Sequence, residues 1–117
     1  MVSIQRFHST SRLSEMAIYN GVIYLAGQVP EKTVQEAAYE QTKEILDLID
    51  QLLAEVGANK SRIISAQIYL ADMSDYDEMN RAWDEWVDTK SPPTRATVEA
   101  KLAVPDWKVE IVITAAA

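Results

Sequence analysis

Apolar and polar residues alternate with a period of two in the first quarter of the chain. Residues 2–7 alternate over their whole length, which predicts a short strand. Residues 8–15 are mostly polar and predict a loop, and residues 16–30 hold two apolar runs separated by Asn20-Gly21. Because Asn and Gly both tolerate positive φ, this pair predicts a two-residue turn that joins the two strands of a β-hairpin.

Two later segments have the period of an amphipathic helix. In residues 33–56 the apolar residues recur at helical spacing, and they predict a helix of about six turns. Thr33 is the expected N-cap, Glu36 would complete a capping box, and Gly57 would supply the C-terminal stop. Residues 74–89 carry an aromatic stripe and predict a second helix, whose tryptophans we expect to pack against a sheet.

Three further strands complete the pattern. Residues 59–73 alternate, and residues 95–102 and 107–117 predict two strands around a turn at residues 104–106. The apolar face of the first of these strands is expected to carry Ile64, Ala66, Ile68 and Leu70. The order of strands and helices predicts a single α+β domain over residues 1–117, in which two helices cover one face of a mixed sheet.

The other face of such a sheet has no helix to cover it. Several strands carry small or apolar residues on both sides, so the uncovered face would hold Ala26, Ala96, Val98 and Val112 or their neighbours, depending on register. A large exposed apolar face usually marks an interface. We therefore expect a homo-oligomer.

Composition and charge exclude several classes of function. The chain has no cysteine and a single histidine, His8, which rules out thiolate catalysis and argues against a metal site or a Ser-His triad. The net charge of −7 and the absence of a basic patch argue against nucleic-acid binding. No apolar run is long enough for a membrane span, and the N-terminus lacks the apolar core of a secretory signal. We expect a cytoplasmic protein.

One candidate for chemistry is the arginine of the segment SPPTRATVE, residues 91–99. The two prolines stiffen the entry to a strand, and Arg95 lies at that entry. A guanidinium stays protonated and presents a planar fork that matches a carboxylate in a bidentate manner. Arg95 is therefore either an anion receptor or an ordinary surface or structural arginine.

Four segments in order, YLAGQVP, LAEVGANKSRIISAQIYLADMSDYDEMNRAWDEW, PPTRATVEA and KVEIVITAAA, resemble the Rid family, also called the YjgF or RutC-like family. The resemblance extends over residues 16–117 and is nearest to a branch with a shortened N-terminus. It implies a chorismate-mutase-like (YjgF-like) α+β fold and a homotrimer with active sites in clefts between subunits. It also implies hydrolysis of reactive 2-imino and enamine acids, such as 2-aminoacrylate and 2-iminobutanoate, to 2-keto acids and ammonia, without cofactor or metal.

The resemblance assigns roles to particular residues. Arg95 falls on the family's Pro-x-Arg motif and would bind the substrate carboxylate, and Glu110 would position the attacking water. Gly27 would let the backbone approach the ligand, and Asn80 would donate a hydrogen bond to a loop or to the site of a neighbouring subunit. The structural alternatives are a solvated strand carboxylate at Glu110, a strand bulge or strand end at Gly27 and an exposed helix residue at Asn80.

The chain also departs from the best-studied members of the family. Thr97 stands where they have a cysteine, Leu13 where they have a loop tyrosine, and Ala26 where they have a serine. The thiol is thus dispensable if this chain is active, and the hydroxyl of Thr97 could hold a water instead. Substrate preference is left open by these changes.

Two hypotheses of different classes remain. The first is an imine and enamine hydrolase, and the second is a trimer that binds small carboxylates, or acts as a chaperone, without turnover. Arg95 serves both hypotheses, because each needs a carboxylate receptor, whereas Glu110 favours the enzyme.

Overall fold

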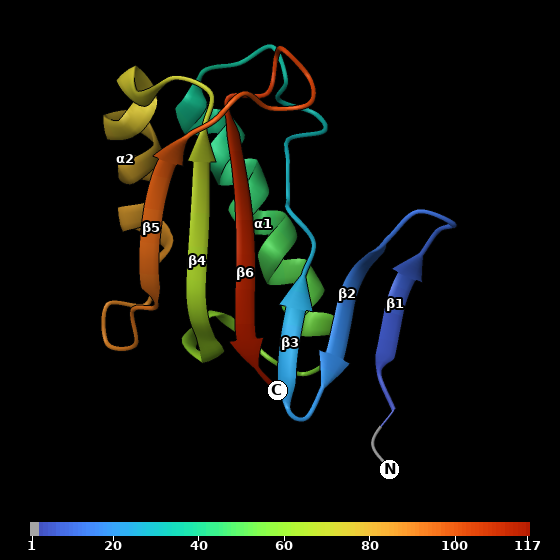
Figure 1. The fold of residues 1–117 in the computed structure, drawn as a ribbon. Coiled ribbons are helices and arrows are strands. Elements are labelled where there is room, and N and C mark those ends of the chain that lie inside the picture. Colours follow the sequence, from blue (N-terminus) through green and yellow to red (C-terminus); the bar gives the residue numbers. More distant parts are fainter. Residues whose placement is uncertain (1–2) are drawn as a thin grey trace.

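The computed structural model describes residues 3–117 and contains one six-stranded sheet with the strand order β1-β2-β3-β6-β4-β5 (Figure 1). The strands are β1 (Gln5–Ser9), β2 (Ser14–Tyr19), β3 (Val22–Leu25), β4 (Ile63–Leu70), β5 (Thr94–Glu99) and β6 (Val109–Ala116). The helices are α1 (Ala38–Glu55) and α2 (Tyr76–Trp86), with short 3₁₀ turns at Lys60–Arg62 and Met73–Asp75. Only β5 runs parallel to its neighbour, β4, and the other pairs are antiparallel, so the sheet is mixed.

Both helices lie on one face of this sheet, α1 behind the central strands and α2 behind β5 (Figure 1). The buried core lies between the sheet and the helices. Its largest fully buried side chains include Ile45, Ile49 and Leu53 of α1, Ile68 and Leu70 of β4, and Ile111 and Ile113 of β6. The predicted α+β class, with two helices on one face of a mixed sheet, is confirmed.

The predicted hairpin is also present. β2 and β3 pair with Tyr19 opposite Val22, and the two residues between them are Asn20 and Gly21, with φ of 52° and 75°. Both lie in the left-handed region that a tight turn of this kind requires. The local chemistry of these two residues therefore sets the register of the hairpin.

The predicted start of the first helix is wrong. α1 begins at Ala38 rather than near Thr33, and Ala37, at the N-cap position, makes no side-chain cap bond. The capping box is absent because Thr33 and Glu44 bond to each other: the hydroxyl of Thr33 donates to the Glu44 carboxylate at 2.6 Å. That carboxylate also accepts the backbone N–H groups of residues 31, 32 and 33 at 3.0 Å each, which folds the loop back over the helix.

Two strand predictions are corrected by local irregularities. Ile64 is 47% exposed instead of buried, because the pairing of β4 with β6 is irregular between Ile63 and Ser65 and Ile63 takes the buried position. The first strand is Gln5–Ser9 rather than residues 2–7. Residues 1 and 2 lie outside the described residues.

Two further boundaries differ less. β2 begins at Ser14, so the predicted loop at residues 8–15 shortens to residues 10–13. β5 ends at Glu99, before the predicted residue 102.

Trp83 is buried in the core as expected, whereas Trp86 donates from Nε1 to Asp50 of α1 at 2.9 Å and so ties the two helices together.

The sheet face opposite the helices is uncovered in the single chain, and it is partly apolar. Tyr24, Tyr19 and Val98 on this face are 50%, 42% and 43% exposed. Val112 and Ala96 lie on the same face. Both pair with Gln67 of β4, which points away from the core because its neighbours Ala66 and Ile68 are buried. The face has the character expected of an interface between copies, and the oligomer itself stays a prediction.

The loop clamp at Glu44 generates a stability prediction. Burial raises the pKa of Glu44, but the hydrogen bonds from the Thr33 hydroxyl and from the backbone N–H groups of Lys32, Glu31 and Thr33 outweigh it and hold the pKa below its ordinary value. The carboxylate therefore stabilises the fold at neutral pH, and this contribution is lost as the pH falls through the lowered pKa.

We expect Glu44→Gln to lower the free energy of unfolding at pH 7 by about 1 kcal/mol, a modest figure because solvent screens the group. Asp84→Asn, at an exposed residue of α2 with no side-chain hydrogen bond in the described residues, is the control and should change stability by less than half of that. Urea denaturation at pH 7 and pH 3 measures both. An effect of Glu44→Gln that is equally large at pH 3 would contradict the charge-based account.

Candidate functional site

Arg95 lies on the helix side of the sheet, at the start of edge strand β5. It pairs with buried Ala66 of β4, and residues paired in this way point to the same face. Its guanidinium reaches α2, where Nη1 donates to Oδ1 of Asn80 at 2.7 Å and Nη2 donates to the hydroxyl of Tyr76 at 3.3 Å. The indole of Trp83 lies beside it, with its ring centroid 5.4 Å from Cζ.

The partners of Arg95 on α2, which also include the sulfur of Met79 at 4.0 Å from Nη1, are electrically neutral. Tyr76, Asn80 and Trp83 are four and three residues apart and so lie on one face of the helix. Within residues 3–117 no carboxylate lies within ion-pair distance of Arg95. A guanidinium has five N–H donors, so this cation is fixed in direction while its charge is uncompensated. The role of Arg95 as an anion receptor stays a prediction.

Thr97 lies two residues after Arg95 and on the same face, since it pairs with buried Ile68. Its Oγ1 atom is buried and has no hydrogen-bond partner within the described part of the chain. A buried hydroxyl left unpaired in this way costs about 1–3 kcal/mol. The structure therefore places an unpaired hydroxyl on the same face of β5 as Arg95, two residues further along the strand.

Gly27 and Glu110 come together in a second place. Tyr24 of β3 pairs with Thr114 of β6, and Gln28 forms an isolated bridge with Ile111. The chain advances by four residues from Tyr24 to Gln28, but β6 advances by only three residues between their partners. The extra residue makes a bulge, which brings the backbone of Gly27 against the carboxylate of Glu110. A Cβ at position 27 would collide with that carboxylate, so any larger residue here would displace the Glu110 side chain from its present position.

Arg95 and Glu110 are not brought together within one chain. Glu110 lies between Val109 and Ile111, which face the core, and it pairs with Tyr69 on the open face. Arg95 is on the opposite face and lies in β5, on the far side of β4 from β6. Its partner in β4 is Ala66, three residues before the Tyr69 that pairs with Glu110. Strand spacings of ~4.8 Å and rises of ~3.3 Å per residue place their Cα atoms roughly 14 Å apart.

The structure thus divides the predicted residues into two half-sites. The receptor half-site consists of Asn80, Arg95 and Thr97, and the carboxylate half-site consists of Gly27 and Glu110. Leu13 belongs to neither half: it is 47% exposed in the tight connection between β1 and β2, where its carbonyl accepts the N–H of Thr10 at 2.8 Å. No group of three or more acidic, His or Cys side chains in residues 3–117 could hold a metal ion.

Sequence reasoning missed Tyr76 and Trp83 as partners of Arg95. Both were assigned only to the apolar stripe of the second helix. The sequence does show that Tyr76 lies four residues before Asn80 and Trp83 three residues after it, which places all three on one face of a helix. The missing information was which strand lies beside that face of the helix.

Comparison with known proteins places this chain and its fold in a family. The family model described as Endoribonuclease L-PSP matches residues 3–117. The chain belongs to the Rid/YjgF/RutC family. A RutC family protein of Haemophilus influenzae is 65% identical over 97% of this chain and 98% of its own length. The RutC family protein YoaB of Escherichia coli is 44% identical over 98% of this chain and 99% of its own.

Solved structures of the family have the same fold. A YjgF-family protein of Neisseria meningitidis superposes with a TM-score of 0.94 at 51% identity, over 97% of this chain and 94% of that one. The fold predicted from the Rid resemblance is therefore confirmed, and no helix in residues 3–117 has the length and hydropathy to cross a membrane.

The unpaired hydroxyl of Thr97 generates a prediction at this half-site. Thr97→Val keeps the shape of the side chain and removes the buried oxygen, so we expect the free energy of unfolding to rise by about 1 kcal/mol. Thr42→Val is the contrasting control, because the Thr42 hydroxyl donates to the carbonyl of Ala38 at 2.7 Å and its loss should destabilise by about 1 kcal/mol. Urea denaturation measures both. Destabilisation by Thr97→Val would mean that its hydroxyl is paired in the folded protein.

Proposed function

We propose that this Rid-family protein hydrolyses reactive 2-imino and enamine acids to 2-keto acids and ammonia, in clefts shared between the subunits of a homotrimer. The observation that carries the proposal is the uncompensated guanidinium of Arg95, fixed by the neutral side chains of α2. Substrates of this class carry a carboxylate next to the reacting carbon, so one anion receptor both binds and orients them.

The reaction needs a water and a route for its proton. Water adds to the carbon of the protonated imine, the C–N bond then breaks, and the nitrogen leaves as ammonia. Of the two protons of the water, one passes from the oxygen to the nitrogen and the other is released to the solvent as the carbonyl forms. Glu110 is the group proposed to hold the water and transfer the proton that passes to the nitrogen. An enamine substrate first takes up a proton at its terminal carbon and becomes the imine. No redox step occurs.

The separation of the two half-sites supports a cleft between subunits. A substrate of three or four carbons cannot contact Arg95 and Glu110 of one chain, because they lie on opposite faces of the sheet. The receptor half-site of one subunit must therefore face the carboxylate half-site of its neighbour. The uncovered apolar face, which includes Tyr24 and Val98, supplies an interface for such an assembly.

Two other functions compete with this proposal. Binding of small carboxylates without turnover uses the same Arg95, and it is the alternative if Glu110 has no catalytic role. The description of the matching family model names an endoribonuclease, but the net charge of −7 repels the phosphate backbone that such an enzyme must bind. Hydrolysis of a small anionic substrate fits Arg95 better.

The cytoplasmic location stays a prediction.

The proposal predicts that the planar fork of Arg95 is essential. Arg95→Lys retains the charge but loses the paired donors, so kcat/KM for 2-iminobutanoate should fall about 10- to 100-fold. Arg62→Lys, an exposed arginine that donates to the backbone carbonyl of Ala117, is the matched control and should retain the parental rate. Ammonia release from freshly generated imine measures turnover. Parental activity in Arg95→Lys would refute the carboxylate-receptor role.

A second variant separates turnover from binding. Glu110→Gln keeps the size of the side chain and removes its basic oxygen, so kcat should fall by roughly 10²-fold or more. Affinity for 2-ketobutyrate, measured by calorimetric titration, should stay equal or rise slightly because a negative charge is lost. Hydrolysis by Glu110→Gln at the parental rate would remove Glu110 from the chemistry and leave the water to backbone groups or to Thr97. If the parent itself releases no ammonia, and Arg95→Ala abolishes its calorimetric signal, the binding protein is the surviving hypothesis.

A further inference from the structure

A cavity of about 380 Å³ lies between α1 and the strands at the β1 side of the sheet. Its polar lining includes His8 of β1, Glu15 of β2, Gln28 and Glu55 at the end of α1. Its apolar lining includes Leu48 and Leu52 of α1. This volume falls within the usual range of small-molecule sites, which are apolar cavities with a few convergent polar groups.

Gln28 is a buried polar side chain in this lining, with an exposed fraction of 6%. Its Nε2 donates to Oε1 of Glu15 and to the carbonyl of Ala26, both at 3.0 Å. Its Oε1 accepts no hydrogen bond from any residue between 3 and 117. Among the described residues this oxygen is not one of the buried unpaired atoms, so it is open to solvent, and the cavity wall offers an acceptor that a ligand N–H could use.

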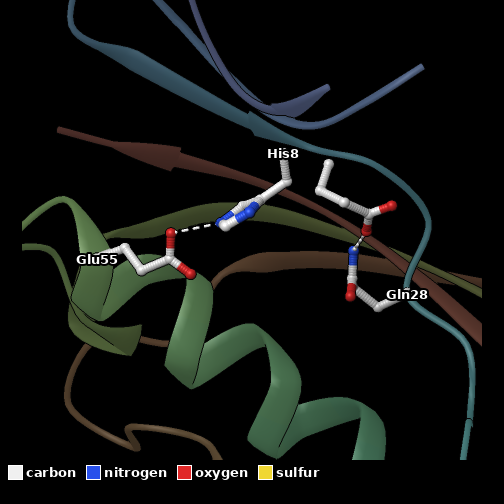
Figure 2. A network of polar contacts seen from close by, with 4 residues as sticks. His8, Gln28 and Glu55 are labelled. Carbon is white, nitrogen blue, oxygen red and sulfur yellow. Dashed lines mark hydrogen bonds and ion pairs between the residues drawn. The ribbon is translucent and has the colours of Figure 1, made fainter. Parts of the chain in front are cut away.

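His8 closes one end of the cavity, and its backbone is unusual. Its φ of 52° lies in the left-handed region, which few residues other than glycine adopt. His8 has no pairing partner in β1, although Phe7 and Ser9 on either side do. The imidazole consequently points toward α1, where Nε2 lies 2.6 Å from Oε1 of Glu55, with Gln28 on its other side (Figure 2).

The charges around the cavity select its ligand. Glu15, Glu31 and Glu55 contribute three carboxylates, and neither lysine nor arginine lines it. The apolar side chains of Leu48 and Leu52 contribute a surface that a bare ion would not use. A ligand that complements both features has a protonated amine and a short hydrocarbon chain.

We propose that this cavity binds aliphatic primary amines, with the ammonium group among Glu15, Glu55 and the Oε1 atom of Gln28. The alkyl chain lies along Leu48 and Leu52. The cavity is distinct from the proposed catalytic cleft, because Glu110 and Arg95 do not line it. Gly27 is the one residue of the half-sites in its lining, so the proposal stands whether or not the protein hydrolyses imines.

The test is a ¹⁵N NMR titration of the intact protein with butan-1-amine hydrochloride at constant ionic strength. Saturable shifts are expected at the amides of Gln28, Val29 and Glu55. Butan-1-ol, which has the same chain without the charge, should give no saturable shift. An equal response to butan-1-ol, or shifts that stay linear with amine concentration, would overturn the proposal. Calcium chloride is a third probe, and the same shifts at lower concentration would show a metal-ion site instead.

Variants locate the ammonium group. Glu15→Gln and Glu55→Gln should each weaken amine binding about three- to tenfold, the range for one partly exposed charge-assisted contact. Glu40→Gln removes the same charge from α1, roughly 22 Å along the helix from Glu55 at ~1.5 Å per residue, and should leave binding within about twofold. A dispersed amide spectrum confirms that each variant is folded. Equal weakening by all three variants would reduce the effect to general electrostatics and refute the site.

Discussion

The pleat of the β-sheet is the constraint on which the whole arrangement depends. Neighbouring residues of a strand point to opposite faces, and the pairing of β5, β4 and β6 places Arg95 on the helix side and Glu110 on the open side. A one-residue change of register would move either group to the other face. The core prevents this change, because the same register buries Ala66, Ile68 and Ile111 against the helices.

The pleat also explains why α2 matters to the candidate chemistry. Arg95 emerges toward the helices from an edge strand, where a cation would ordinarily be neutralised by a nearby carboxylate or turned to solvent. Asn80 and Tyr76 satisfy two of its donors without cancelling its charge, and Trp83 presents an aromatic ring beside it. The helix therefore orients the guanidinium and leaves its attraction for an anion intact.

Local sequence signals predicted the parts of the fold that local forces decide. Asn20-Gly21 specifies its turn because the two residues tolerate positive φ, and both have it. The periods of two and 3.6 gave the strands, the helices and the α+β class. The start of α1 was mispredicted because the bonds of Glu44 to residues 31–33 cross eleven or more positions of sequence. The exposure of Ile64 depends on an irregular pairing with a strand near the C-terminus.

In the candidate site, too, local sequence predicts the residue types, whereas contacts between distant segments decide the geometry. The sequence motifs identify Arg95, Asn80 and Glu110 as candidate site residues. They do not predict the contact between Arg95 and Asn80, because that contact depends on which edge of the sheet α2 packs against. The opposition of Arg95 and Glu110 follows from register across three strands, which alternation within a single strand does not reveal. This opposition turns an expected shared cleft into a geometric requirement of the proposed reaction.

Subunit complementation tests that requirement most directly. Arg95→Ala and Glu110→Gln chains are unfolded and refolded together in equal amounts, and imine hydrolysis is compared with that of each variant refolded alone. If each site takes Arg95 from one subunit and Glu110 from its neighbour, random assembly restores about a quarter of the parental activity, since each half-site is intact with a chance of about one half. If both residues act from the same chain, no mixed assembly contains an intact site. Activity of the mixture no greater than the mean of the two separate variants would therefore contradict the account.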